Sequence, residues 1–486
     1  MFEEKLKEFE SIFYPKSIAV VGASTNEKRV GSQWVKGLIS AGFQGSVYPI
    51  GSGGGTISGL KIFPNLKFVP GEIDYVVVCV PRQSVLELLD DCIAKKVKAV
   101  QFFTAGFSET GKPEGRELEE QMVRKAGQGG IRIIGPNCAG IYCPENKISC
   151  GPSSEGRIGI SGSVGFVSQS GGIACKLMEI GIARCINYSK GISFGNGIDL
   201  DASDFLQYLA IDPKTTIIGA YLEGARDGRR LFETMKEVTK IKPLVVWKGG
   251  RTETGAQAAM SHTGSLASSA FVWSAMLKQV GALEVHSLEE LTDTLLIFQQ
   301  LRFWQGDNVA IIGGLADGGG GISVSASDAC VESGLKLPPL SKKAQRELTS
   351  LLGEVGSILH NPIDVSPAQF QGFPALFRAI ELVVQDPVIE LVLIQEDIDI
   401  ILSYWAEAEK INDFLIDLRS KQNKPLVVVL PPGSAEPERL NIEQKLLKAS
   451  IPAFPTMERA AKAIVAINKY FSSRQTMPSN NLNSLG

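Results

Sequence analysis

The first part of the chain repeats one pattern, in which an apolar, β-branched run leads through a glycine-rich or polar turn into an amphipathic stretch of helical period. Continuous apolar runs that alternate with helices are typical of parallel sheets covered on both faces. We therefore expect a Rossmann-like α/β domain over residues 1–144. Its predicted strands are Ser17–Gly22, Ser46–Ile50, Asp74–Val80, Ala99–Thr104 and Ile131–Gly135.

Two further alternations of the same kind follow, and they predict a domain over residues 145–302 and another over 303–472. Strands in doubly wound sheets usually keep their ligand sites beyond their carboxyl ends. The polar residues 473–486 are expected to form a flexible tail. The predicted strands are Val164–Ser168, Ile186–Ile192, Thr216–Leu222, Leu244–Trp247 and Leu283–Val285 in the second domain, and Val309–Gly313, Leu391–Gln395 and Leu426–Leu430 in the third.

The charge balance of the 486 residues is nearly even, with a formal net charge of -3. Such a balance gives no general attraction to polyanions, so we expect no nucleic-acid partner. The amino-terminal segment is charged and amphipathic, and no later run approaches the roughly 20 apolar residues that a membrane-spanning helix needs. We therefore expect no membrane association and a cytoplasmic location.

The sequence does not favour a metal-binding site. The eight cysteines are scattered without a Cys-x-x-Cys pair, and the chain has three histidines, which disfavours a zinc site. Cys138, Cys143 and Cys150 would be candidates for an iron–sulfur cluster, but their wide spacing matches no standard ligand pattern. We interpret the cysteines as reduced, mostly buried thiols and expect no metal on this chain.

The first candidate site is the turn from Gly22 to Gly31, between the first strand and the first helix of the domain. Free backbone N–H groups at a helix start attract anions, so this turn resembles a nucleotide-phosphate loop. A longer polar excursion replaces the compact G-x-G-x-x-G pattern, which disfavours NAD. A bulkier phosphorylated adenosine compound such as coenzyme A fits better. The alternative is a purely structural βα turn.

The second candidate is the turn Ser168-Gln169-Ser170-Gly171-Gly172, where a strand runs into a helix. Hydroxyl groups and N–H donors at a helix start form an oxyanion site, so this turn would hold a phosphate group. It contains no G-x-S-x-G elbow, which argues against a serine nucleophile. Simple helix capping by Ser170 is the alternative.

The third candidate is the segment from Lys248 to Ala267, which follows a buried strand and is rich in small residues. We expect a long loop that exposes His262 among Ser, Thr and Gly neighbours. An imidazole acts as a nucleophile or base near neutral pH, and small neighbours let it approach a phosphate. His286 and His360 are expected to have structural roles.

Glu223 is the carboxylate best placed to assist this histidine. It stands at the end of the predicted strand Thr216–Leu222, and a carboxylate at the carboxyl edge of a sheet can orient an imidazole and favour its charged form. The alternative is an ordinary acidic residue at a helix start.

Taken together, these segments resemble the NDP-forming acyl-CoA synthetase superfamily, which includes ADP-forming acetate–CoA ligase and succinate–CoA ligase. The resemblance covers about residues 10–470, and its most specific element, residues 261–267 (SHTGSLA), is similar to the family's phosphohistidine loop. Further matching segments, in the family's order, are residues 20–24, 104–111, 135–140, 168–172, 221–224 and 361–365.

The resemblance implies an alpha subunit of ADP-forming acetate–CoA ligase type. Its fold would be a CoA-binding Rossmann-like domain followed by two flavodoxin-like, succinyl-CoA synthetase-like domains. Its activity would be a relay in which phosphate attacks an acyl-CoA thioester, the acyl phosphate phosphorylates His262, and the phosphohistidine phosphorylates a nucleoside diphosphate. Glu223 would steady the histidine.

Further site residues are implied by matching positions. The phosphate-binding residues would be Ser168, Ser170, Gly171 and Gly172. Coenzyme A would contact Gly22, Ala23, Ser24, Val30, Pro49, Val80, Pro81, Thr104, Ala105 and Gly106.

The family's ATP-grasp part, which holds ATP or ADP and Mg²⁺, has no counterpart in the sequence. The resemblance therefore implies a separate ATP-grasp beta subunit, in a hetero-oligomer such as α2β2, and a small carboxylic acid as substrate.

The sequence also departs from the family pattern at three places. The segment Val47–Gly53 lacks a lysine that relatives could offer to a phosphate of coenzyme A. Cys175 replaces the tyrosine of succinate-specific relatives, which disfavours a dicarboxylic substrate, and the turn Asp317–Gly321 lacks the usual asparagine.

Two rival functions are less consistent with the sequence. A non-catalytic sensor of coenzyme A or acyl-CoA would be expected to replace His262, which is intact. A nicotinamide-dependent oxidoreductase is disfavoured by the glycine spacing of the first turn.

Overall fold

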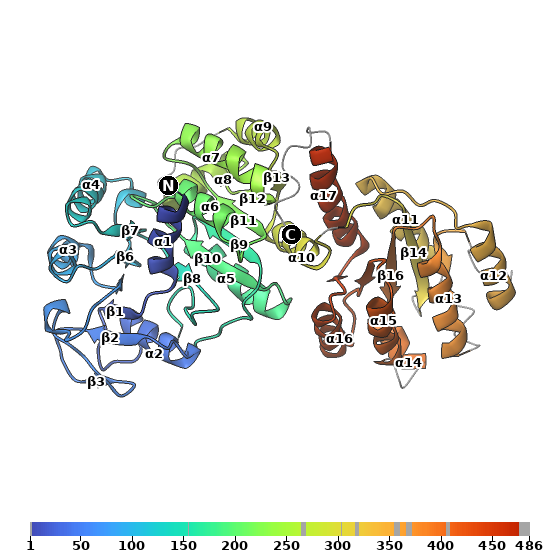
Figure 1. Cartoon of the computed structure of the whole chain (residues 1–486), viewed down its shortest axis with the longest axis horizontal. Coiled ribbons are helices and arrows are strands. Elements are labelled where there is room, and N and C mark those ends of the chain that lie inside the picture. Colours follow the sequence, from blue (N-terminus) through green and yellow to red (C-terminus); the bar gives the residue numbers. More distant parts are fainter. Residues whose placement is uncertain are drawn as a thin grey trace. The chain divides into compact units, whose positions relative to one another are not determined.

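The computed structural model describes residues 2–153, 155–263, 269–302, 304–315, 320–353, 360–365, 372–404 and 409–475. Contacts divide the chain into two units, Met1–Leu291 and Thr292–Gly486, whose elements are labelled in Figure 1. The first unit holds a five-stranded and a six-stranded sheet, and the second unit holds a five-stranded sheet. In this described part, no helix has both the length and the apolar character needed to cross a membrane.

The first sheet is parallel, with the strand order β2-β1-β5-β6-β7. The order reverses at β1, because the chain places β2 on one side of it and β5 on the other. Doubly wound sheets bind ligands at such a reversal, beyond the carboxyl ends of the strands. The elements are α1 Phe2–Phe13, β1 Ser17–Val21, α2 Val30–Ala41, β2 Ser46–Ile50, β3 Thr56–Ile57, β4 Leu60–Lys61, η1 Leu66–Phe68, β5 Tyr75–Val78, η2 Arg82–Ser84, α3 Val85–Ala94, β6 Ala99–Phe102, η3 Ser108–Thr110, α4 Pro113–Gln128 and β7 Arg132–Ile134.

The side chains of this sheet alternate between two cores, as expected for a sheet covered on both faces. Val76 and Val78 of β5 belong to a core that includes Leu89 of α3 and Met122 of α4. These two helices pack against each other beside the sheet (Figure 1). Residues Tyr75 and Val77, which alternate with them, belong to a second core, which continues into the second sheet.

Helix α1 connects the two sheets of the first unit. The rings of Phe9 and Phe13 stack on Tyr208 of α6, with centroid distances of 4.8 and 5.2 Å. All three side chains are buried. The amphipathic amino-terminal segment is therefore part of the core.

The second sheet has the strand order β13-β12-β11-β9-β10-β8, and its pairs are parallel except for the edge strand β8, which is antiparallel to β10. Strand β8 was not expected, and it precedes the predicted boundary at residue 144. The elements are β8 Gly140–Tyr142, β9 Val164–Ser168, α5 Gly171–Ala183, β10 Tyr188–Ser193, α6 Ala202–Ile211, β11 Ile217–Leu222, α7 Gly228–Ile241, β12 Leu244–Lys248, α8 Glu253–Thr263, α9 Ala270–Val280, β13 Leu283–Val285 and α10 Leu288–Gln300.

The third sheet, in the second unit, is parallel with the strand order β15-β14-β16-β17-β18. The Asn361 side chain binds the backbone beside this sheet. Its oxygen accepts a hydrogen bond from the Ile311 backbone N–H at 3.1 Å, and its N–H₂ group donates to the carbonyls of Val309 and Pro338, each at 2.9 Å. The elements are β14 Val309–Leu315, α11 Gly320–Ser333, α12 Lys342–Leu352, β15 Ile363–Asp364, α13 Phe373–Gln385, β16 Leu391–Glu396, α14 Ile398–Tyr404, α15 Glu409–Lys421, β17 Leu426–Val429, α16 Glu436–Lys448, β18 Ala453–Phe454 and α17 Met457–Gln475.

The α/β class with doubly wound sheets is thus confirmed. One expectation about the end of the chain is wrong in part, because α17 continues to Gln475, into the segment 473–486 that we expected to be a tail. The remainder of that segment lies outside the described residues.

Candidate functional site

The turn from Gly22 to Gly31 brings the start of α2 against the end of β1. Gly22 has a φ of 104°, and a Cβ atom on it would lie 2.7 Å from the Cys79 carbonyl oxygen. A Cβ atom on Gly31 would lie 2.5 Å from the Gly22 carbonyl oxygen. Gly31 therefore has the role of a close-packing glycine, although the turn is longer than that of the dinucleotide-binding pattern.

A pocket of about 700 Å³ lies beside this turn, at the carboxyl edge of the first sheet. Its lining comes from the turns after β1 and β2, from the segment that leads into η1, and from the start of α3. The pocket has the size of a cofactor site, and it lies where the strand order reverses.

Four of the residues expected to contact coenzyme A line this pocket: Gly22, Ala23, Ser24 and Val80. The others, Val30, Pro49, Pro81, Thr104, Ala105 and Gly106, are not among its lining residues. Two of these have internal hydrogen bonds instead. The Thr104 hydroxyl donates to the Val80 carbonyl at 2.6 Å, and the Gly106 carbonyl accepts from the Arg82 guanidinium.

Further polar residues line the pocket, some within the expected turn and some outside it. They include Asn26 and Arg29 in the long turn, Asn65 before η1, and Glu87 and Asp91 on α3. Asp91 forms an ion pair of 2.7 Å with Lys67. The rule that turns after neighbouring parallel strands meet at one edge would have pointed to the turn residues, but not to the residues on α3.

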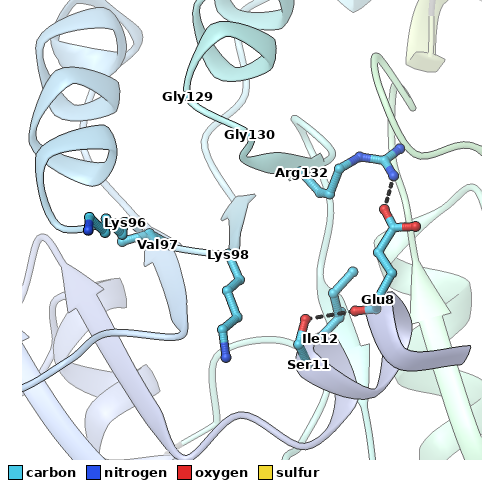
Figure 2. A pocket seen from close by; sticks show the side chains of 9 residues that line it. All are labelled: Glu8, Ser11, Ile12, Lys96, Val97, Lys98, Gly129, Gly130 and Arg132. Atoms are coloured by element: carbon cyan, nitrogen blue, oxygen red, sulfur yellow. Dashed lines mark hydrogen bonds and ion pairs between the residues drawn. The ribbon is translucent and has the colours of Figure 1, made fainter. Parts of the chain in front are cut away.

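A smaller hollow of about 250 Å³ lies at the opposite, amino edge of this sheet, and Figure 2 shows its lining. Two of its cationic groups, Arg132 and Lys98, are paired. Arg132 binds Glu8 of α1 and, at 2.9 and 3.0 Å, the carboxylate of Asp199, while Lys98 lies 2.9 Å from Asp74. We interpret this hollow as a structural junction between α1 and the sheets.

The candidate phosphate turn lies at the carboxyl edge of the second sheet. Ser168 ends β9, and its hydroxyl donates to the Ser170 carbonyl at 2.7 Å. Ser170 occupies the N-cap position of α5, but its side chain makes no capping hydrogen bond. Simple capping by Ser170 is therefore ruled out as the explanation of this serine, and the first N–H groups of the helix remain available in principle to an anion.

Gln169 connects this turn to the candidate carboxylate. Its backbone N–H donates to the Tyr221 carbonyl at 2.9 Å, and its side-chain oxygen accepts from the backbone N–H groups of Glu223 at 2.8 Å and Gly224 at 3.1 Å. The turn after β9 and the turn after β11 are thereby held together. The sequence analysis gave Gln169 no role of its own.

Glu223 is buried, with 5% of its surface exposed, and follows directly after β11. The Tyr221 hydroxyl donates to its carboxylate at 3.0 Å. The alternative that Glu223 is a helix-start acid is wrong, because α7 begins at Gly228 and is capped by the Asp227 side chain.

The segment that carries His262 differs from the expected loop. Residues Glu253–Thr263 form helix α8, because the alanines in GAQAA are strong helix formers that outweigh the single glycine. His262 lies in the last turn of α8, but its side chain, like residues 264–268, lies outside the part that the structure describes. Helix α8 packs against η3 of the first domain.

A polar cluster lies around η3. The Asn196 side-chain N–H₂ group donates to Glu109 at 2.7 Å and to Glu119 at 2.8 Å, and Glu119 also accepts from the Ser108 hydroxyl at 2.7 Å. Arg226, which follows β11, lies 3.6 Å from the Glu119 carboxylate. These contacts bring the turn after β6 to the edge of the second sheet that carries Glu223.

The eight cysteines are free, and five of them are buried, including Cys138, Cys143 and Cys150. Burial raises the pKa of Cys143 to about 11 and that of Cys79 to about 12. The described residues contain no group of three or more histidine, cysteine, aspartate and glutamate side chains that would hold a metal ion. The interpretation of mostly buried thiols is confirmed.

Comparison with known proteins supports the order of the three domains. A CoA binding domain model matches residues 16–144, a succinyl-CoA ligase like flavodoxin domain model matches residues 161–298, and a ligase-CoA domain model matches residues 309–478.

Curated relatives cover most of the chain. The alpha subunit of ADP-forming acetate–CoA ligase I from Pyrococcus furiosus is 35% identical over 95% of this chain and 97% of that protein. The ADP-forming acetate–CoA ligase I of Archaeoglobus fulgidus is 34% identical over 95% of this chain, which spans 63% of that longer protein.

A solved structure is similar over the same extent. The acetyl-coenzyme A synthetase 1 of Candidatus Korarchaeum cryptofilum, in complex with phosphate and ADP, has a TM-score of 0.80 and 31% identity, and the match covers 96% of this chain and 97% of that one. The chain therefore belongs to the ADP-forming acetate–CoA ligase alpha-subunit family, within the NDP-forming acyl-CoA synthetases.

Proposed function

We propose that the protein interconverts an acyl-CoA, phosphate and ADP with a carboxylic acid, coenzyme A and ATP. Coenzyme A binds the pocket beside the Gly22–Gly31 turn, and the acyl group is a small monocarboxylate such as acetate. The names of the relatives support the reaction, and the pocket at the reversal of strand order supports the binding site.

The observation that carries the proposal is the junction made by Gln169. It holds the phosphate turn and Glu223 together at one sheet edge, in the same unit as the pocket. Phosphate attacks the thioester carbonyl and displaces the thiolate of coenzyme A. The N–H groups at the start of α5 stabilise the charge on the acyl phosphate, which transfers its phosphoryl group to His262 and leaves as a carboxylate.

The nucleotide side of the reaction belongs to a partner. ATP or ADP and Mg²⁺ bind an ATP-grasp beta subunit, which takes the phosphoryl group from His262. The longer relative from Archaeoglobus fulgidus, of which this chain spans 63%, supports a second part of this kind. We further propose that the two subunits form a hetero-oligomer such as α2β2 and that it works in the cytoplasm.

Phosphorylation of the histidine tests the proposal. We expect the chain, incubated with radiolabelled acetyl phosphate or with the partner subunit, ATP and Mg²⁺, to acquire label that is labile in acid and stable in base. His262→Ala should acquire none. His286→Ala is the matched control, because His286 is an exposed histidine of the same domain and should leave labelling unchanged.

Two results would overturn the proposal. Label retained in His262→Ala would move the phosphoryl acceptor elsewhere. A wild-type chain that binds acyl-CoA but acquires no label by either route would make the protein a non-catalytic acyl-CoA sensor.

A further inference from the structure

Lys248 is a buried lysine that the sequence analysis assigned to no role. It is the last residue of β12 and pairs with Leu222 at the end of β11. Only 2% of its surface is exposed. Its ammonium group donates to the Glu223 carbonyl at 2.8 Å and to the Gly249 carbonyl. It thus contacts the backbone of the candidate carboxylate residue and the first residue of the segment that leads into α8.

Within the described residues, this ammonium forms no ion pair. The hydrogen-bond acceptors that the structure gives it are carbonyl oxygens, and the ring of Trp273 on α9 lies 5.4 Å from the nitrogen. Burial lowers the pKa of Lys248, and the negative charge of Glu223 opposes that shift. Burial of a charged ammonium costs free energy. A side chain that served only to hydrogen-bond these carbonyls would not need to carry a charge.

We propose that Lys248 is a positioning residue for phosphoryl transfer: it fixes Glu223 and the start of the histidine-bearing segment relative to each other, and its positive charge favours the phosphorylated enzyme. The inference rests on the proposed function. In the proposed relay, negative charge arrives at the carboxyl edge of the second sheet, where Lys248 ends β12. A fixed ammonium at that edge lowers the energy of the charged state, because the charge is already oriented before transfer.

A second lysine, next to the other end of β12, gives the matched control. Lys242 precedes β12, at the opposite edge of the sheet, and its ammonium group also donates to two carbonyls, those of Leu209 at 2.8 Å and Asp212 at 2.6 Å. Lys242→Met removes the same type of contact from the same sheet, away from the candidate site. If the loss of lysine-to-carbonyl hydrogen bonds has a general effect on the sheet, that effect should appear in both Lys248→Met and Lys242→Met.

The test compares Lys248→Met, Lys248→Arg and Lys242→Met with the wild type. The rate constant of phosphoenzyme formation at saturating acetyl phosphate is measured by rapid quench, coenzyme A affinity by calorimetry, and folding by thermal melting. We expect Lys248→Met to lower the rate constant at least tenfold and to keep coenzyme A affinity within twofold. Lys248→Arg should recover part of the rate, and Lys242→Met should stay within twofold of the wild type.

The pH profile separates charge from packing. In the wild type, the rate should fall at alkaline pH as the ammonium loses its proton, and this limb should be absent from Lys248→Met. Titratable groups beside it in the described structure include Tyr221 of β11 and Glu223, which follows β11. Burial keeps the pKa of Tyr221 above its ordinary value.

The possible failures are distinct. A wild type that acquires no label overturns the proposed function and the role of Lys248 with it. A labelled wild type with an equally fast Lys248→Met, or with equal losses in Lys248→Met and Lys242→Met, overturns the role of Lys248 alone. If Lys248→Met does not fold, Lys248→Gln replaces it, because the amide can still donate to a carbonyl but carries no charge. A rate for Lys248→Gln equal to that of the wild type would then contradict the proposal.

Discussion

Glu396 shows how a single buried group can set the pH dependence of the second unit. It ends β16, no part of its surface is exposed, and its two carboxyl oxygens have no hydrogen-bond partner in the described structure. Burial raises its pKa to about 8 from an ordinary value of 4.5. The native carboxyl group is therefore protonated at neutral pH, whereas the unfolded chain ionises it.

We expect the second unit to lose stability as pH rises from about 4.5 to 8, because the unfolded state releases a proton that the native state retains. Above that range the loss is complete, and it amounts to at most roughly 5 kcal/mol. Glu396→Leu should remove this dependence and raise the melting temperature at pH 8. Denaturation of both proteins at pH 5 and pH 8 measures the free energy of unfolding. If this free energy changes equally with pH in the wild type and in Glu396→Leu, the assignment is contradicted.

At the level of residues, the roles of His262 and Glu223 stay predictions, while the structure adds supporting contacts that the sequence analysis did not anticipate. His262 and Glu223 were singled out because an imidazole among small residues and a carboxylate at a strand end have recognisable surroundings. Gln169, Asn196 and Lys248 were missed, because their contacts join residues far apart in sequence. The bond between Gln169 and Glu223, for example, spans 54 positions.

Helix α2 should depend on the close contact at its start. Gly31→Ala places a methyl group 2.5 Å from the Gly22 carbonyl, so the helix must move away from β1. We expect a loss of about 1 to 3 kcal/mol in stability, as for other overpacked positions, and weaker binding of coenzyme A.

Gly127→Ala in α4 is the control for this change. A methyl group there meets nothing within 4 Å, and alanine favours the helix, so stability should hold or rise. Thermal melting and titration with coenzyme A are the measurements. Equal behaviour of the two variants would show that the contact at Gly31 is not tight in solution.

Among elements, long apolar strands were predicted well and short ones poorly. Strands β2 and β9 have the predicted bounds, because each is a distinct apolar run, and the three-residue strand β13 is a short exception that was also predicted. Strands β15 and β18 have two residues each, and β8 has three, so no periodicity can develop in them. Their pairing is set by neighbouring strands. Helix α8 was taken for a loop because glycine and serine content was weighed above its alanines.

At the scale of the whole molecule, coenzyme A should protect one edge of one sheet. Hydrogen exchange should slow on addition of coenzyme A at residues 21–29, 50–53, 64–66 and 80–91, which contain the lining of the pocket. Residues 309–396 should be unchanged. An equal effect of NADH would contradict the assignment of the pocket, and protection confined to the second unit would contradict its location.

The stacking of α1 on α6 should determine how the first unit unfolds. Tyr75 and Val77 of the first sheet, the rings of Phe9 and Phe13, and Tyr208 beside the second sheet all belong to one core. Cutting between the two sheets would leave these apolar groups in water, at about 25 cal/mol for each Å² exposed. Residues 1–291 should thus melt in one cooperative step. The regions that match the CoA binding domain model and the succinyl-CoA ligase like flavodoxin domain model should therefore unfold together.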